Sequence, residues 1–378
     1  MIDANRMVES FMDLVRIDSV SREEGRLAAY LQKQLEALGA ETVFDGSAGQ
    51  TGSDTGNLIA RFNGHGDQPP LLLSAHMDTV EPGRGIQPIL KSGRITSDGT
   101  TILGADDKSA IAILLEALQV IKTSGRPHPP LELVFSTCEE IGLLGAKNLD
   151  WSLISARQGY VLDTRDPEGL VVRAPSANRL KFTVVGRDAH AGSTPEKGIS
   201  AILVAAQAIA TLELGRLDAE TTCNLGVIKG GDATNIVPKI VQVDGEVRSH
   251  DDGKLAEVTQ HMINAFEKAA ASHPERRQGE LPWVNVDVHP DFKRTHIPND
   301  HAVVEMARAA AARLDRPLSL QVAGGGSDAN VFFQQGIMTG VLGTGMTDVH
   351  SVREYVELED MVKACQMVLE ILDIYHQS

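Results

Sequence analysis

Cysteine and basic charge are both scarce in this 378-residue sequence, and each shortage excludes a class of protein. The three cysteines, Cys138, Cys223 and Cys365, are odd in number and far apart, so they predict neither a disulfide framework nor a Cys-x-x-Cys zinc site. A reducing, cytoplasmic location fits this usage. Lys and Arg total 35 against 51 for Asp and Glu, giving a net charge of -16. Without a basic stripe to bind phosphates, nucleic acid is not expected as a partner.

Long apolar runs are also missing. No stretch approaches the roughly 20 apolar residues that a membrane span needs. The first sixteen residues mix acids and bases with apolar residues and contain no small-residue cleavage site. We therefore expect neither a membrane partner nor a leader segment.

What is present is typical of a folded protein. Hydrophobic residues make up 42% of the chain and charged residues 23%, and the length favours two domains over one. The acidic excess has two interpretations, a solvated acidic surface, which is the commoner cause, or carboxylates gathered to bind cations.

Helical and strand patterns alternate through most of the chain, which favours an α/β fold with a mostly parallel sheet. Helices are predicted at 4–17, 23–38, 109–121, 301–314, 329–335 and 356–375, and strands at 42–44, 57–62, 71–75, 131–137, 160–162, 318–322 and 338–342. Ser21 and Glu24 have the spacing of a capping box for the second helix. The Gly- and Ser-rich segment 45–56 is predicted to be an exposed loop.

The pattern changes in the middle of the chain. Between 177 and 291 the predicted order is βαββαβ, which is the split βαβ, ferredoxin-like arrangement and makes a complete small domain. We therefore predict two domains. A discontinuous first domain comprises 1–176 and 292–378, and a second comprises 177–291, inserted into the first.

Acidic and histidine side chains follow several predicted strands directly. His76 and Asp78 follow one strand, Glu139 and Glu140 a second, and Asp163 a third. Asp106 lies in a loop that opens a helix on the same edge, and His350 follows a later strand. Any one such acid is usually a helix cap or turn residue. Because the carboxyl ends of parallel strands share one edge, however, the group together predicts a cation site.

The donors in this group suit a borderline divalent metal. His76, Asp106, Glu140, Asp163 and His350 supply two imidazoles and three carboxylates, which favour zinc, with manganese or cobalt as alternatives. Five ligands are too many for one tetrahedral zinc with an open position. If one carboxylate bridges, they fit two metals, and Glu139 is then free to act as a base. Spacing alone leaves open whether Asp106 or Asp107 is the bridge.

Taken together, these motifs resemble those of a known family. Ser-Ala-His76-Met-Asp78-Thr-Val, Gly-Ala-Asp106-Asp107-Lys, Thr-Cys-Glu139-Glu140-Ile-Gly, Leu-Asp163, Asp-Ala-His190-Ala-Gly and His350-Ser look like motifs of the co-catalytic dizinc peptidases. That family includes peptidase T, carnosinase-like dipeptidases, carboxypeptidase G and the aminoacylases. The resemblance covers nearly the whole chain and is closest to peptidase T. It implies a phosphorylase/hydrolase-like catalytic domain with an inserted lid and dimerisation domain, and hence a homodimer.

The resemblance also implies a role for each matching residue. Asp106 would bridge two metal ions, joined to Asp107 by a cis peptide. His76 and Asp163 would hold one ion, and Glu140 and His350 the other. Asp78 would orient His76, and Glu139 would be the general base and later the acid. His190 would stabilise the tetrahedral intermediate, from its own subunit or from the partner.

Within the family, Asp at position 163 is typical of aminopeptidases and dipeptidases, so the resemblance favours a metal-dependent exopeptidase acting on di- or tripeptides. Asn235, Arg248 and Ser327 are candidates for binding substrate, although a structural ion pair explains Arg248 equally well. The alternatives are an N-acyl-amino-acid amidohydrolase or carboxypeptidase of the same family, and a non-catalytic metal- or peptide-binding protein with this fold.

Overall fold

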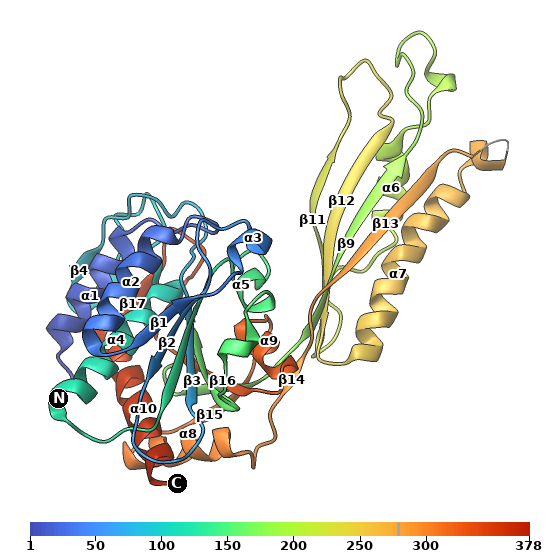
Figure 1. Ribbon diagram of the computed structural model, residues 1–378. Helices are drawn as coiled ribbons and strands as arrows, with labels where there is room; N and C mark the ends of the chain where they lie inside the picture. The colour runs from blue at the N-terminus through green and yellow to red at the C-terminus, as the bar shows by residue number, and fades with distance from the viewer. Residues whose placement is uncertain (278–279) are drawn as a thin grey trace. The chain divides into compact units, whose positions relative to one another are not determined.

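The structure, a computed structural model, describes residues 1–277 and 280–378 and separates into two compact units. Unit 1 comprises Met1–Arg173, Thr295–Ala323 and Ser327–Ser378. Unit 2 comprises Ala174–Arg294 together with Gly324–Gly326 (Figure 1). The roles of catalytic domain and lid, and the boundaries at 176/177 and 291/292, stay predictions.

A nine-stranded sheet forms the centre of unit 1, in the order β1-β2-β6-β3-β7-β16-β8-β14, with β15 beside β8. Its strands are β1 (Glu41–Phe44), β2 (Leu58–Phe62), β3 (Leu71–His76), β6 (Leu131–Ser136), β7 (Gln158–Thr164), β8 (Gly169–Ala174), β14 (Thr295–His296), β15 (Ser319–Val322) and β16 (Met338–Gly343). The four central strands β6, β3, β7 and β16 are mutually parallel. Strands β1 and β2 pair antiparallel with their neighbours, and β8 pairs antiparallel with β16 and parallel with β15. The mostly parallel α/β fold predicted from the sequence is confirmed.

Helices cover both faces of this sheet. They are α1 (Ala4–Arg16), α2 (Gly25–Leu38), α3 (Ala48–Thr51), α4 (Ala105–Ser124), α5 (Leu144–Lys147), α8 (Ala302–Arg313), α9 (Asp328–Gln334) and α10 (Leu358–Gln377), with a 3-10 turn at Trp151–Leu153. Leu71 and Leu73 pack in the larger core with α1, α4 and α10, whereas Leu72 packs in the smaller core with α9. Since strand side chains alternate, His76 lies on the face of Leu72.

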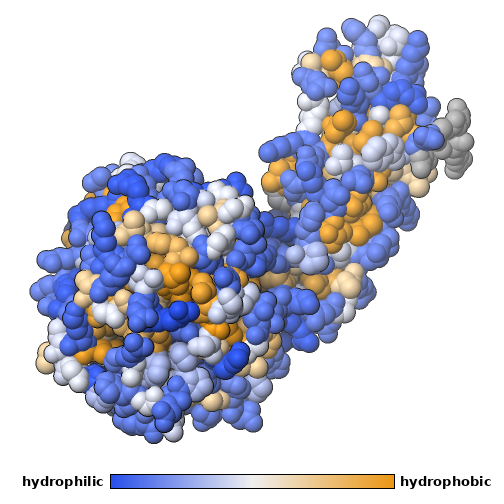
Figure 2. All heavy atoms as spheres, in the orientation of Figure 1, coloured by the Kyte–Doolittle hydropathy of each residue, from blue (hydrophilic) through white to orange (hydrophobic). Residues whose placement is uncertain are grey.

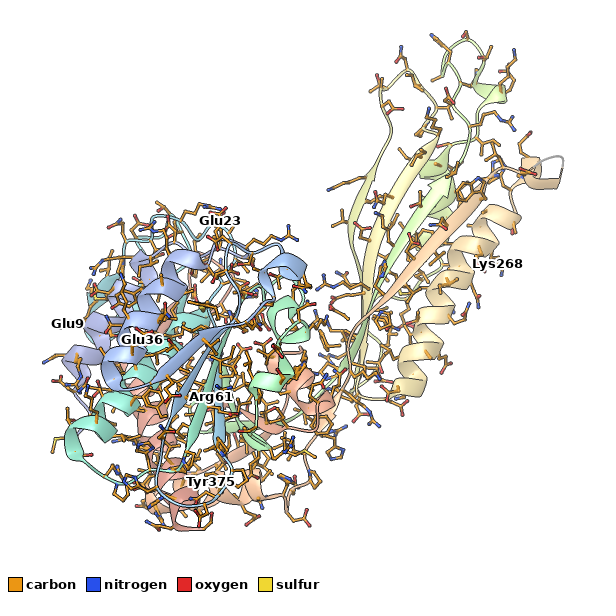
Figure 3. All side chains as sticks on the ribbon, viewed as in Figure 1. Glu9, Glu23, Glu36, Arg61, Lys268 and Tyr375 are labelled. Atoms are coloured by element: carbon orange, nitrogen blue, oxygen red, sulfur yellow. The ribbon has the colours of Figure 1, made fainter. Side chains whose placement is uncertain are left out.

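A small three-stranded antiparallel sheet completes unit 1, built from β4 (Ile89–Lys91), β5 (Arg94–Thr96) and β17 (Tyr355–Glu357). Charged side chains such as Glu9 and Glu36 lie on the outside of α1 and α2, and Lys268 is exposed on unit 2 (Figure 3). No helix in the described ranges combines the length and apolar character of a membrane span.

Unit 2 is a five-stranded sheet in the order β10-β11-β12-β9-β13. Its elements are β9 (Ser176–Val185), a 3-10 turn (Pro195–Lys197), α6 (Ala201–Ile209), β10 (Gly215–Arg216), β11 (Thr221–Gly230), β12 (Ile240–Ser249), α7 (Asp252–Ala271), a second 3-10 turn (Pro274–Arg277) and β13 (Trp283–Phe292). Without the short β10, this is the ferredoxin-like order predicted for the insertion. The rings of Phe182 and Phe266 stack with centroids 4.0 Å apart where α7 packs on β9.

Three local predictions were wrong. The second helix begins at Gly25 with Glu24 as its N-cap residue and no side-chain cap, because Ser21 and Glu24 are hydrogen-bonded elsewhere. The segment 45–56 contains the short helix α3 and buried side chains. Strand β8 was missed; it is the strand that runs antiparallel to β16.

Candidate functional site

Four of the predicted site residues lie where parallel strands end. His76 is the last residue of β3, Glu139 and Glu140 follow β6, and Asp163 lies near the end of β7. Because these strands are parallel neighbours, their carboxyl ends meet at one edge of the sheet. Asp106 lies at the start of α4, and His350 lies in the segment between β16 and β17, both within unit 1.

The carboxylate of Asp106 lies between the two imidazoles of the predicted site. Its Oδ1 is 3.0 Å from His76 Nε2, and its Oδ2 is 3.2 Å from His350 Nε2. His350 Nε2 is also 3.0 Å from Glu140 Oε1. One carboxylate thus faces two nitrogen donors with different oxygens, which is the arrangement that a bridging ligand requires.

Two groups of donors are close enough to hold metal ions. Ligand atoms of His76, Asp106 and Glu140 lie within 4.8 Å of one another, and so do those of His76, Asp107 and Asp163. The ambiguity between the two adjacent aspartates therefore has a structural basis, since each belongs to one group. The peptide between Asp106 and Asp107 is cis, as the resemblance implied.

Asp78 is fully buried beside this cluster, and its backbone and side chain make different contacts. The closest contact of His76 Nδ1 is the backbone carbonyl of Asp78, at 2.9 Å, with the carboxylate at 3.5 Å. The Asp78 carboxylate accepts hydrogen bonds from the backbone N–H groups of Glu139 (2.9 Å) and Glu140 (3.2 Å), and from Ser21 Oγ (2.6 Å). Asp78 therefore contacts both the imidazole and the loop that bears the two glutamates.

The pKa shifts of the carboxyl groups in this cluster indicate whether metal ions would fit the site. Burial raises the pKa of Asp107, Glu139 and Asp163 well above the ordinary values. Burial acts in the same direction on Asp106, but hydrogen bonds with His350 and His76 lower the pKa of Asp106 overall. The protein thus gathers more carboxylates than its two imidazoles can neutralise, and divalent cations would supply the missing charge.

Unmet hydrogen bonding at Asp107 supports the same conclusion. Asp107 is fully buried, and its Oδ2 accepts a hydrogen bond from His76 N at 3.1 Å. Its Oδ1 has no hydrogen-bond partner among the described residues. A buried carboxylate oxygen without a partner costs free energy, which the positive charge of a nearby cation would offset. The donors present therefore fit a dinuclear metal centre.

A buried glutamate that the sequence reasoning missed holds the Asp106 loop. Glu354 is 1% exposed, and its carboxylate accepts the N–H groups of Leu103 (2.8 Å), Gly104 (2.8 Å) and Asp106 (3.0 Å). It lies four residues after His350, so one side chain ties the two loops that carry these donors. The sequence holds a signal, an acid shortly after a candidate ligand, but its partners lie some 250 residues away.

Asp328 is a second buried acid that the sequence reasoning missed. It is 2% exposed at the start of α9, and its carboxylate accepts a hydrogen bond from Ser136 Oγ at the end of β6. Burial raises its pKa to about 6. Asp328 thus adds to the negative charge next to His76 and Asp78.

The remaining predicted residues are not members of the two donor groups, and most of them belong to the other unit. His190, Asn235 and Arg248 belong to unit 2. His190 is exposed and forms an isolated β-bridge with Ile236, and next to it Ala191 N donates to Asn235 O at 2.9 Å. Arg248 forms an ion pair with Glu246 at 3.0 Å. Ser327, in unit 1, is buried and caps α9.

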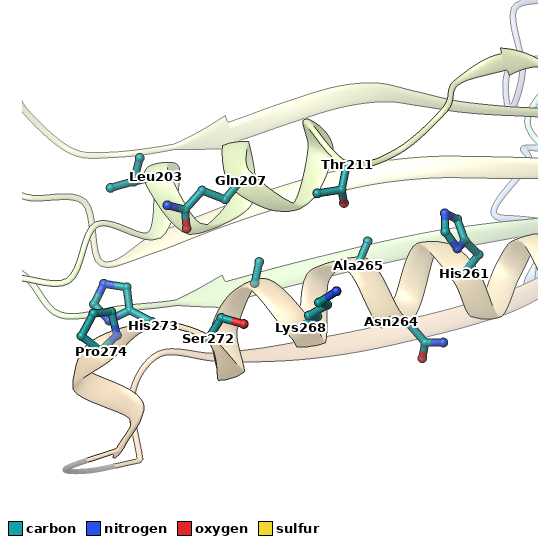
Figure 4. A pocket seen from close by; sticks show the side chains of 11 residues that line it. Leu203, Gln207, Thr211, His261, Asn264, Ala265, Lys268, Ser272, His273 and Pro274 are labelled. Atoms are coloured by element: carbon teal, nitrogen blue, oxygen red, sulfur yellow. The ribbon is translucent and has the colours of Figure 1, made fainter.

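Unit 2 also has a groove between α6 and α7, with a volume of about 830 Å³ (Figure 4). Leu203 and Gln207 line it from α6 and Thr211 from the turn after α6, and His261 and Lys268 are among the residues from α7. The lining residues include no carboxylate, so this groove lacks the donors of the cluster in unit 1.

Comparisons with known proteins identify the family of this chain. The family model described as Peptidase family M20/M25/M40 matches residues 72–373, well over half of the chain. The chain belongs to this family. The M20/M25/M40 match spans all five predicted metal ligands, from His76 to His350.

Relatives and solved structures extend the similarity over the whole chain of this M20/M25/M40 peptidase. The uncharacterized protein YqjE of Bacillus subtilis is 40% identical over 99% of both chains, and peptidase T of Escherichia coli is 25% identical over 99% of both. A tripeptidase structure from Staphylococcus aureus has a TM-score of 0.92 at 37% identity, covering 100% of both chains. The aminopeptidase PepT structure from Bacillus cereus has a TM-score of 0.86 at 40% identity, covering 98% of both.

Family membership makes this protein a peptidase, a hydrolase of peptide bonds. The resemblance stated from the motifs and the predicted enzyme class are confirmed. The individual site residues stay predictions, now with a geometry that brings five of them together.

We expect the His350→Ala variant to lose one metal ion. His350 lies beside Asp106 and Glu140, and it is not a member of the donor group that contains Asp163. Its loss should therefore affect one ion and leave the other in place. Elemental analysis after dialysis should give two divalent ions per chain in the wild type and about one in the variant. The exposed His289 supplies the control, since His289→Ala should keep both ions. Two ions retained in His350→Ala would remove this residue from the ligand set.

Proposed function

We propose that this M20/M25/M40 peptidase is an exopeptidase that removes the amino-terminal residue from di- or tripeptides at a dinuclear metal centre. The observation that carries the proposal is the Asp106 carboxylate between His76 and His350, with further carboxylates on either side. The names of similar proteins, tripeptidase, aminopeptidase and peptidase T, support the substrate class.

His76 and Asp163 would hold one ion, Glu140 and His350 the other, and Asp106 both. The mixture of imidazole and carboxylate donors favours zinc, with manganese or cobalt as alternatives. When bound, the ions would polarise the scissile carbonyl and acidify a water molecule. His76 is set up for this role because Nδ1 is engaged by the Asp78 carbonyl, which leaves Nε2 as the donor atom.

Glu139 would act as the general base and then as the acid. Its side chain is 8% exposed, and burial raises the pKa of its carboxyl, which makes it a stronger base than an exposed glutamate. It would take a proton from water and deliver it to the leaving amine. The two Asp78 hydrogen bonds fix the backbone on which Glu139 is mounted.

His190 would stabilise negative charge on the reacting carbonyl oxygen, in its own subunit or in a partner. Its Nδ1 accepts hydrogen bonds from the N–H groups of Gly192 and Ser193, both at 3.1 Å. The ring proton therefore lies on Nε2, and the exposed imidazole presents an N–H donor.

Asn235, Arg248 and Ser327 stay candidates for binding substrate. Arg248 would have to exchange its pairing with Glu246 for a peptide carboxylate, which an Arg can bind with two hydrogen bonds. Ser327 already serves as a helix cap, so its contribution would come from the loop that it fixes.

We propose a cytoplasmic location and a homodimer as well. The three cysteines are all free and buried, which suits a reducing compartment. For the dimer, unit 2 carries most of the exposed large apolar side chains, and apolar patches are visible on it in Figure 2. In addition, β10 pairs with β11 only at Thr222 and Cys223, so 224–230 is an open edge among the described strands.

Removal of the Glu139 carboxylate should abolish turnover without loss of metal. For Glu139→Ala and Glu139→Gln we expect kcat to fall by about 10³-fold or more, since general base catalysis contributes roughly 10²–10⁴-fold. Hydrolysis of a tripeptide and metal content should be measured on the same samples. Glu41→Gln, at an exposed site on β1, is the control. Near-normal turnover in a metal-loaded Glu139 variant would contradict the mechanism.

A free amino terminus should be required in the substrate. We expect free di- and tripeptides to be hydrolysed at least about tenfold faster, in kcat/KM, than the same peptides with an acetylated amino terminus. Each pair should be assayed with added zinc, manganese or cobalt. Faster hydrolysis of the N-acylated form would instead favour an amidohydrolase, and hydrolysis of neither form would favour the non-catalytic alternative.

The dimer should depend on the open edge of β11. We expect light scattering to give twice the chain mass for the wild type and a shift toward the single-chain mass for Ile228→Asp, since a charge on this edge opposes strand pairing. Ile228 is 56% exposed, as is Val322 in unit 1, so Val322→Asp is a matched control. A monomeric wild type at micromolar concentration would contradict the proposal.

A further inference from the structure

We infer that Glu24 is a positioning residue that sets the place of Glu139, the base of the proposed function on which this inference rests. Glu24 is fully buried at the start of α2, far from Glu139 in the sequence. Its carboxylate accepts the backbone N–H of Cys138 at 2.9 Å, and Cys138 immediately precedes Glu139.

Both oxygens of the Glu24 carboxylate accept hydrogen bonds, and one of them binds the loop after β6. Oε1 accepts the N–H groups of Cys138 and Arg22, the latter at 3.0 Å, and contacts Cys138 Sγ at 3.4 Å. Oε2 accepts a hydrogen bond from Ser53 Oγ. None of these donors carries a charge, and burial raises the pKa of Glu24. A buried carboxylate with only neutral partners lowers the free energy of unfolding. We therefore expect Glu24 to contribute to the active site and not to stability.

The backbone of Cys138 explains what the contact achieves. Its φ is +53°, in the left-handed region that residues with a Cβ rarely adopt. Glu24 engages Cys138 through both its N–H and its thiol, so it favours this conformation from two sides. This left-handed residue comes shortly after β6 and thereby sets the direction in which the chain continues to the next residue, Glu139.

Three consecutive N–H groups after β6 are thus held by two carboxylates. Glu24 takes that of Cys138, and Asp78 takes those of Glu139 and Glu140. Ser21, in the same short loop as Glu24, donates to Asp78 Oδ2 at 2.6 Å. The segment from Ser21 to Glu24 therefore supplies one of these carboxylates and a hydrogen bond to the other.

The test asks whether the length or the charge of the side chain at position 24 matters for turnover. Glu24→Gln keeps the length and one acceptor oxygen for the Cys138 N–H, so kcat should stay within about threefold of the wild type. Glu24→Asp keeps the charge but is one methylene shorter, so kcat should fall by about 10- to 100-fold with KM within twofold, because small misplacements of catalytic groups cost that much. Both variants should retain two metal ions.

A matched control separates positioning from general stability. Glu116 is another buried glutamate of unit 1, paired with Arg6 at 2.6 Å. Glu116→Asp should lower the melting temperature but leave kcat per folded molecule unchanged. A readout besides activity is alkylation of Cys138 followed by mass spectrometry, which should become faster in Glu24→Asp relative to Cys365, also buried.

Double variants show whether Glu24 acts through Glu139. In a Glu139→Gln background, Glu24→Asp should cause no further loss of kcat, since the base is already absent. An additive loss, a wild-type kcat in Glu24→Asp, or an active Glu24→Asp with an inactive Glu24→Gln would each overturn the positioning role. If Glu139→Gln itself stays active, the proposed function fails, and that outcome is distinct from failure of the role of Glu24 alone.

Discussion

The carboxylate of Asp106 lies between two imidazoles, and the groups around it carry more negative charge than those imidazoles can balance. Asp107, Glu139 and Asp163 are close by, and burial raises the pKa of each. Ionising all of these carboxyl groups is unfavourable on its own and becomes favourable when cations bind beside them. The rest of unit 1 can be understood as the scaffold that keeps these groups together against their mutual repulsion.

The scaffold works because it distributes the repelling groups over several rigid elements. Parallel strands β3, β6 and β7 each deliver their donors to one edge of the sheet, and α4 brings Asp106 from a separate segment. Further buried acids, Asp78, Glu24 and Glu354, are not predicted metal ligands, and their carboxylates accept backbone N–H groups of the loops. Backbone amides thus neutralise part of the charge and fix the loops at the same time.

The sequence could bring these candidate donors together at one edge of the sheet because their signal is local. His76, Glu139 and Asp163 follow apolar strand patterns, and a parallel sheet makes the ends of such strands meet. Glu24 and Glu354 could not be found in this way, since their partners are more than 100 residues away in the chain. The Ser21-x-x-Glu24 spacing predicted a capping box, which is a local interaction. In the structure Ser21 instead donates to Asp78, and Glu24 accepts the N–H of Cys138. Likewise, β8 is held by its pairing with β15 and β16, which come about 150 residues later in the chain.

The insertion of unit 2 between β8 and β14 has a consequence for how the chain folds. Closing a loop as long as 174–294 costs entropy that unit 1 must overcome before β14 can join its sheet. The two ends of unit 2 are neighbours, however, because Arg294 N donates to Ser176 Oγ at 2.8 Å and Phe292 pairs with Ala177. Once unit 2 has folded, it acts as a short connection between the two halves of unit 1. Early folding of the insertion would therefore remove most of the entropic barrier to completing the nine-stranded sheet.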